Sequence, residues 1–331
     1  MDRPSNMLPH LIDIGAAGPV HMLPTSRRVP RAIAHQKMEA HWLGPPMYNP
    51  ASLSPFQVAM NLIRFDQEGE PFFTKEFLRE MQAQLARPLQ SGERYTSIGV
   101  DGTPVEFEPA FGQVSNHMEF QYVNGPVRLV YVPWNILITQ ACSESSLNPA
   151  SYCRVLPMHV KQYLYPGTGE IMQLPPINPE IILDLLEEAI NDWETSNAWT
   201  TVKETLIAVR SRHTIDNLVA FSCGSIFGEF AAGIQHAMLL LIMNLFGVGG
   251  GDGLCEELLA CSVQDPNYKE WDKETLMALD MKVVDDPQGF LDVEDESIVF
   301  TCASDVPVKE IVLEIARPAI IIWEDITRIN S

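Results

Sequence analysis

The chain has 331 residues and a formal net charge of −21, with 46% apolar and 20% charged residues. This composition excludes a disordered tail, a collagen and a coiled coil, and the length suits one large domain or two modest ones. Nucleic acids and anionic membrane surfaces both need a basic protein surface. We therefore expect neither as a partner.

Residues 1–5 carry no basic region followed by an apolar stretch, so we expect no signal peptide and a cytoplasmic protein. The most apolar segment, 226–246, has the length of a membrane span but reads better as a buried helix. Four polar residues interrupt it: Glu229, Gln235, His236 and Asn244. The six cysteines form no CxxC pair and reach no zinc spacing with histidine, which predicts reduced thiols and no metal site.

The two parts of the chain differ in chemistry. Residues 1–177 hold 13 Lys and Arg, 15 Asp and Glu, and 20 of the 25 prolines. Residues 178–331 hold 9 basic and 28 acidic residues and five prolines. The contrast predicts a boundary after Ile177, between a nearly neutral proline-rich part and an acidic, regular one.

The N-terminal part is predicted to be an α+β region. Residues 1–55 lack periodicity and read as an extended arm, whereas 74–85 reads as a helix with Thr74 as N-cap. Asp-Gly and Asn-Gly supply the positive φ that tight hairpin turns need. They predict two antiparallel hairpins: 95–100 with 105–107 around Asp101-Gly102, and 120–123 with 127–132 around Asn124-Gly125.

The C-terminal part alternates strands and helices. After two helices at 180–190 and 199–209, short apolar runs typical of strands buried on both faces alternate with amphipathic or apolar helices. This order predicts a mostly parallel sheet with helices on both faces. The strands are expected at 218–221, 258–263, 282–284, 298–301 and 320–323, and the helices at 226–246, 273–280 and 308–316.

Five short motifs stand in order in this part: Ser222-Cys223-Gly224-Ser225, Gln235-His236, Gln264-Asp265-Pro266-Asn267-Tyr268, Val306-Pro307-Val308, and Arg317-Pro318-Ala319 leading to Trp323. Together they resemble the SRR1-like domain, in the version common in filamentous fungi, over roughly residues 195–327. The first loop of that family usually reads Gly-x-Gly, and here Ser222 replaces the first glycine. Its side chain narrows the space for a phosphate. Residues 1–177 resemble no family.

The resemblance implies a Rossmann-like fold. It links the chain to members with roles in circadian regulation and haem homeostasis. It also links it to fungal members encoded beside secondary-metabolite genes, some of which act as cycloaddition catalysts on polyketide–terpenoid intermediates.

Ligands of open parallel sheets bind outside the carboxyl ends of the strands. That rule selects the loops after four predicted strands. The ligand-binding candidates are Ser222, Cys223, Gly224, Ser225, Gln264, Asp265, Tyr268, Cys302, Ser304, Asp305 and Trp323.

Each candidate also has an ordinary structural interpretation. The first loop either binds an anion through its N–H groups or simply caps the next helix through Ser225. Asp265 either accepts a ligand hydroxyl or closes an Asp-Pro turn, and Tyr268 either contacts a ligand or covers the sheet. Cys223 and Cys302 read as packing residues rather than nucleophiles, since their surroundings are acidic. His236 is a general base or a hydrogen-bonded core residue.

The leading hypothesis is an enzyme of natural-product biosynthesis that binds an apolar polyketide or terpenoid intermediate. It would catalyse a cofactor-free cyclisation, such as a hetero-Diels–Alder cycloaddition, with the proline-rich region as one pocket wall. No catalytic triad, metal set or cofactor motif is visible, and no catalytic residue is assigned. The alternatives are a non-enzymatic regulatory or haem-related SRR1-like protein and, third, a methyltransferase-like enzyme that uses S-adenosylmethionine. The chain is long and apolar enough to form a homodimer.

Overall fold

The computed structural model describes residues 10–13, 40–42, 54–69, 71–87, 89, 93–100, 102, 104–117, 120–143, 152–173, 175–227, 230–247, 258–302 and 304–323. The chain forms two compact units. One unit is Lys37–Pro175, and the other joins Met1–Gln36 to Pro176–Ser331. The division near Pro176 lies beside the expected boundary, but the start of the chain belongs to the C-terminal unit.

A six-stranded, wholly parallel sheet forms the centre of the C-terminal unit, as the alternating pattern predicts. The strand order is β1-β12-β11-β8-β9-β10, which is the order of a doubly wound fold with its sixth place taken by the N-terminal strand. The strands are β1 (His10–Asp13), β8 (Asn217–Phe221), β9 (Ala260–Gln264), β10 (Met281–Val283), β11 (Ser297–Thr301) and β12 (Ile320–Trp323).

Strand β1 departs from the extended arm expected for residues 1–55. It pairs with β12 in parallel, from His10 opposite Ile320 to Asp13 opposite Trp323. Four residues of strand, more than 300 positions away along the chain, carry too little periodicity to be recognised in the sequence.

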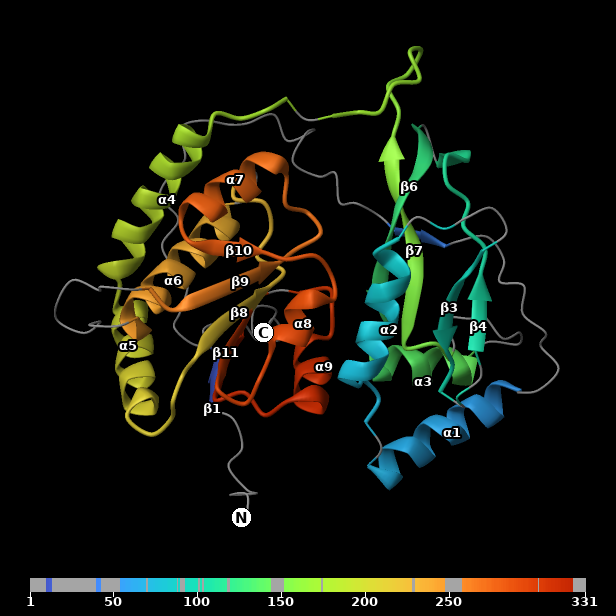
Figure 1. Cartoon of the computed structure of the whole chain (residues 1–331), viewed down its shortest axis with the longest axis horizontal. Helices are drawn as coiled ribbons and strands as arrows, with labels where there is room; N and C mark the ends of the chain where they lie inside the picture. Colours follow the sequence, from blue (N-terminus) through green and yellow to red (C-terminus); the bar gives the residue numbers. More distant parts are fainter. Residues whose placement is uncertain are drawn as a thin grey trace. The chain divides into compact units, whose positions relative to one another are not determined.

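Helices cover both faces of the sheet (Figure 1). The chain runs outward from β8 to β10 through α6 (Phe230–Phe246) and α7 (Glu270–Ala278). It then returns past β8 and runs in the other direction through α8 (Gln288–Asp292) and α9 (Val308–Ile315). Right-handed crossovers place helices on opposite faces when the direction reverses. The reversal makes the carboxyl ends of β8 and β11 the topological switch point of the sheet.

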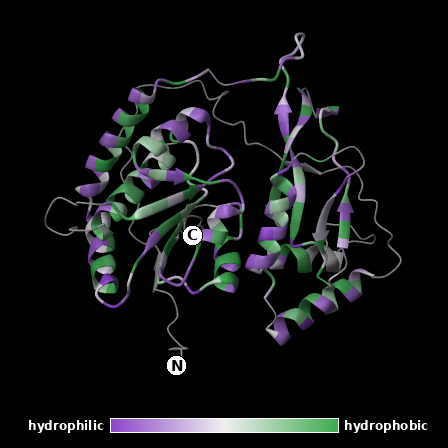
Figure 2. Ribbon diagram, viewed as in Figure 1, coloured by the Kyte–Doolittle hydropathy of each residue, from purple (hydrophilic) through white to green (hydrophobic). Residues whose placement is uncertain are grey.

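Two amphipathic helices precede the sheet, as predicted. They are α4 (Pro179–Glu194), which packs on α6, and α5 (Asn197–Arg210). Asn178 and Ser196 cap them by accepting from the N–H groups of Glu180 and Trp199. Their apolar faces join the core that covers the sheet, and Figure 2 shows the polar residues of α4 on its outer side.

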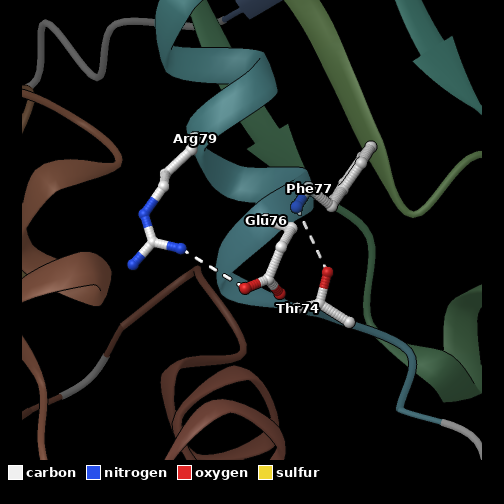
Figure 3. Close-up of polar contacts among 4 residues, drawn as sticks. All are labelled: Thr74, Glu76, Phe77 and Arg79. Carbon is white, nitrogen blue, oxygen red and sulfur yellow. Dashed lines mark hydrogen bonds and ion pairs between the residues drawn. The ribbon is translucent and has the colours of Figure 1, made fainter.

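Unit Lys37–Pro175 is built around a four-stranded antiparallel sheet with the order β2-β7-β6-β5 and a separate β3–β4 hairpin. The predicted helix is α2, and Thr74 accepts the N–H of Phe77 at 3.2 Å as its N-cap, while Arg79 pairs with Glu76 (Figure 3). The elements are α1 (Pro55–Glu68), α2 (Lys75–Leu85), α3 (Trp134–Ser143), β2 (Ala40–Trp42), β3 (Tyr95–Ile98), β4 (Pro104–Phe107), β5 (Val114–His117), β6 (Phe120–Tyr131) and β7 (Val155–Tyr163).

Of the two hairpins predicted here, the structure confirms one. Strands β3 and β4 pair across Gly102, whose φ is 80°. The expected hairpin at Asn124-Gly125 is wrong, because β6 runs straight through it with a bulge between Asn124 and Val127. A Cβ on Gly125 would lie 2.7 Å from the side chain of Gln162, so the glycine permits close approach of β7 rather than a turn.

The apolar segment 226–246 forms a helix only from Phe230. No helix among the described residues is long and apolar enough to cross a membrane.

We predict that deletion of residues 1–13 destabilises the C-terminal unit. The deletion removes the strand that pairs with β12, and several backbone hydrogen bonds at about 1 kcal/mol each give a loss of roughly 2–4 kcal/mol. Urea unfolding measures the change, and deletion of residues 1–8 is the matched control because it leaves β1 in place. An unchanged midpoint after the longer deletion would show that β1 does not stabilise the sheet.

Candidate functional site

Two loops meet at the switch point, and we call them the switch-point loops. One follows β8 and comprises 222–226, and the other follows β11 and comprises Cys302 with 304–307. Strands β8 and β11 are neighbours in the sheet, with Phe221 opposite Thr301. Nine residues of the predicted set lie in these loops or in the turn after β9, where Asp265 and Tyr268 stand.

A pair of serine hydroxyls joins the two loops. The Oγ atoms of Ser222 and Ser304 lie 2.7 Å apart, and the N–H of Val306 donates to Ser304 Oγ at 3.0 Å. The two hydroxyls carry two protons, and only one of them can lie between the oxygens. Whichever serine donates, the pair keeps one O–H that it can direct to another acceptor.

Ser222 holds its hydroxyl in place through an unusual backbone conformation. Its φ is 58°, in the left-handed region that favours glycine, and its N–H donates to the carbonyl of Gln264 at 3.1 Å. Glycine adopts this conformation without steric strain. A serine there costs about 1 kcal/mol of backbone strain and adds a hydroxyl at the switch point.

Two N–H groups of the first loop, those of Gly224 and Ile226, are bound by carboxylates of the same unit. Asp265 accepts from Gly224 with one oxygen and from Asn267 with the other, each at 2.7 Å. Asp272 is fully buried and accepts from Ile226 at 3.1 Å and from Lys269 at 2.8 Å. Burial raises the pKa of both carboxyl groups, and the N–H bonds oppose that rise.

The two carboxylates oppose the binding of an anion by the first loop. The N–H groups of Gly224 and Ile226 already face negative charge, and a phosphate oxygen would have to displace a carboxylate or lie beside it. The expectation that Ser225 caps the long helix is wrong, because α6 begins at Phe230. Ser225 Oγ instead contacts the carbonyl of Phe227 at 3.4 Å. The loop geometry therefore disfavours a nucleotide.

A buried histidine and tyrosine lie behind the first loop. His236 Nδ1 contacts the carbonyl of Ala232 at 2.7 Å, and its Nε2 lies 2.9 Å from the hydroxyl of Tyr268. A carbonyl can only accept, so Nδ1 carries the proton and Nε2 accepts from Tyr268. Burial lowers the pKa of His236 to about 4, which keeps the ring neutral. Both nitrogens and the tyrosine hydroxyl are thus engaged inside the protein.

The cysteines near the loops are buried thiols. Burial is the main reason that the pKa of Cys223 lies well above its ordinary value, with Cys302, Asp265 and Cys261 adding to the effect. Burial also raises the pKa of Cys261 to about 12. A thiol nucleophile needs a lowered pKa, so these groups are unsuited to covalent catalysis.

The remaining predicted residues lie at the edges of the site. Gln264 accepts the N–H of Gly289 at 2.7 Å and donates to Asp286 at 3.0 Å, which ties β9 to the start of α8. Trp323 ends β12, and Lys309 Nζ lies 4.4 Å from the centre of its ring. Asp305 is exposed to solvent. Among the described residues, no three His, Cys, Asp or Glu side chains gather as metal ligands.

Besides Asp272, sequence reasoning missed a second polar residue of this region, Thr301. It is the last residue of β11, opposite both Phe221 of β8 and Trp323 of β12. It is 6% exposed, and its hydroxyl has no hydrogen-bond partner among the described residues. A hydroxyl at the end of a buried strand with three apolar central residues was the available signal.

We predict that His236 makes the protein less stable in acid. Above pH 6.5 the ring is neutral in the folded and unfolded chains and has no effect on the pH dependence. As pH falls from 6.5 to about 4, the unfolded chain binds a proton that the folded chain does not. Folding then loses about 3 kcal/mol from this residue.

The comparison of wild type with His236→Gln isolates this contribution, because Asp265 and Asp272 titrate in both proteins. Urea unfolding is measured at intervals between pH 7.5 and pH 4. The wild-type free energy of unfolding is expected to fall more steeply than that of the variant. Parallel curves would mean that His236 binds protons equally in both states.

Comparison with known proteins agrees with the motifs. Residues 200–331 match the family model described as the SRR1 domain. No curated protein and no solved structure matches the chain. The matched segment begins within α5 and includes β8 to β12 and both switch-point loops. Residues 200–331 are therefore similar to the SRR1 domain, and this matched segment holds the whole candidate site.

Proposed function

We propose that the SRR1-like domain binds a neutral, mostly apolar small molecule at the switch-point loops and accelerates its cyclisation without a cofactor. The free O–H of the Ser222–Ser304 pair would donate to a carbonyl oxygen of the substrate. The substrate would be a polyketide or terpenoid intermediate of natural-product biosynthesis, and the reaction a pericyclic closure such as a hetero-Diels–Alder cycloaddition.

The serine pair is the observation that carries this proposal. It lies at the switch point, where doubly wound folds bind ligands, and it retains a hydroxyl proton after its internal bonds are made. A positioned donor stabilises negative charge that develops on a carbonyl oxygen during reaction. Holding two reacting ends together removes a further part of the barrier, roughly 7–11 kcal/mol at best.

The charge of the loops supports a neutral substrate. Asp265 and Asp272 accept the N–H groups of Gly224 and Ile226, and residues 178–331 hold 28 acidic against 9 basic residues. Nucleotide and other phosphate ligands would meet negative charge there. The thiols are buried and His236 is enclosed, which favours positioning and hydrogen bonding over a covalent intermediate.

The alternative is a non-enzymatic regulatory or haem-related protein. Haem iron is held by a histidine nitrogen, a cysteine thiolate, a methionine or a tyrosine, and a histidine can serve only if one of its nitrogens is free. His236 uses both nitrogens on Ala232 and Tyr268, and His159 contacts Gly125 and Ala110 with its two nitrogens. Neither of these two histidines therefore offers a free nitrogen to haem iron. A regulator that only binds the same small molecule would show affinity without any change in reaction rate.

We predict that Ser222→Gly separates function from stability. Glycine relieves the positive φ, so the variant should be as stable as wild type or more stable by about 1 kcal/mol. Loss of the hydroxyl should weaken ligand binding about 3- to 10-fold and slow cyclisation about 10- to 100-fold.

A panel of conjugated polyketide and terpenoid ketones is tested by thermal shift, with S-adenosylmethionine, NAD(P)H and haem in the same panel. Compounds that bind are then tested for cyclisation rate and stereochemistry. Ser297→Ala is the matched control, since it removes a serine hydroxyl from the opposite end of β11. Equal binding and rates in Ser222→Gly, Ser297→Ala and wild type would overturn the proposal, as would stabilisation by a cofactor alone.

A further inference from the structure

We infer that Thr301 is a second ligand-contacting residue and that the substrate carries two neighbouring oxygen functions. The first oxygen would accept from the serine pair and the second would bond to the Thr301 hydroxyl. This inference rests on the proposed function. It adds to it the chemical class of the substrate, a neutral ketone with an adjacent hydroxyl or ether oxygen.

The position of Thr301 ties it to the serine pair. It lies opposite Phe221, the residue before Ser222, and three residues before Ser304 on its own chain segment. Neighbouring strands of a sheet lie about 4.8 Å apart, so the three hydroxyl residues belong to one small area at the carboxyl ends of β8 and β11.

The surroundings of Thr301 make its hydroxyl unusual. Residues 297–300 of β11 are fully buried, and Phe221 and Trp323 lie beside Thr301 on the neighbouring strands. A buried hydroxyl normally finds a hydrogen-bond partner, and the described part of the chain offers none to Thr301. Valine has nearly the same shape and would avoid this cost. A threonine at this place is explained if a ligand atom supplies the missing bond.

The hydroxyl of Thr301 is buried, so the inference requires that a bound ligand gains access to it. Ser304 follows Thr301 on the same chain segment and is bound to Ser222. A ligand at the serine pair would therefore lie next to the end of β11, where Thr301 stands.

The test uses Thr301→Val with a pair of probes: a chalcone with a hydroxyl group ortho to its ketone, and the parent chalcone without that group. Valine should raise the melting temperature by about 2–4 °C, because it removes an unpaired buried hydroxyl. It should weaken binding of the hydroxychalcone about 3- to 10-fold and leave binding of the parent chalcone unchanged. A role in packing alone would change both affinities equally.

Thr275→Val is the matched control. Thr275 is equally buried in the same unit, but its hydroxyl already donates to the carbonyl of Trp271. This variant should bind both chalcones as wild type does.

The outcomes separate this inference from the proposed function. Unequal binding of the two chalcones that disappears in Thr301→Val supports the inference. If Ser222→Gly weakens binding and Thr301→Val does not, the inference is wrong and the serine pair stands. If wild type binds neither chalcone, the inferred substrate class is wrong. The proposed function is then tested only by the thermal-shift and cyclisation experiments with the ketone panel.

Discussion

The site depends on two carboxylates that hold the loop after β8. Asp265 and Asp272 both come from the next strand–helix unit along the chain, yet each accepts an N–H of the first loop, from Gly224 and Ile226. These hydrogen bonds connect the loop after β8 to the segment that contains β9 and α7. They also give a partner to two backbone N–H groups that would otherwise be unpaired in a buried turn. The loop therefore keeps one shape without help from a ligand, and the serine hydroxyl at its start is placed in advance.

The same bonds change what a doubly wound fold can recognise. The usual use of this loop is to offer free N–H groups to a phosphate. Here the carboxylates of Asp265 and Asp272 accept two of those N–H groups. In addition, Ser222 carries a side chain at a left-handed backbone position, where a glycine would leave more space for a phosphate. These contacts oppose anion binding at the place where doubly wound folds bind their ligands. The hydroxyls of Ser222, Ser304 and Thr301 remain at this end of the sheet, and the proposal of an uncharged substrate rests on them.

Much of the C-terminal unit could be predicted from local patterns. Runs such as 218–221 and 298–301 are short and mostly apolar, and an apolar helix at 226–246 lies between them in the sequence. This alternation of strands and helices indicates a parallel sheet. Predictions failed where contacts between distant segments of the chain, rather than the local sequence, determined the local structure. Asn124-Gly125 has the composition of a turn, but the glycine serves close packing against Gln162 in a continuous strand. Strand β1 is too short to be recognised without its partner β12.

The sequence by itself determined the fold class, the order of the elements and the loops in which the candidate residues lie, because these follow from periodicity and from the rule for carboxyl ends of parallel strands. Only the tertiary structure decided which candidates act together. It placed Ser222 beside Ser304, turned Tyr268 inward to His236, and left the hydroxyl of Thr301 buried without a described partner. Hydrogen bonds between residues 32 to 82 positions apart depend on strand order and backbone conformation, which no local pattern of residues contains.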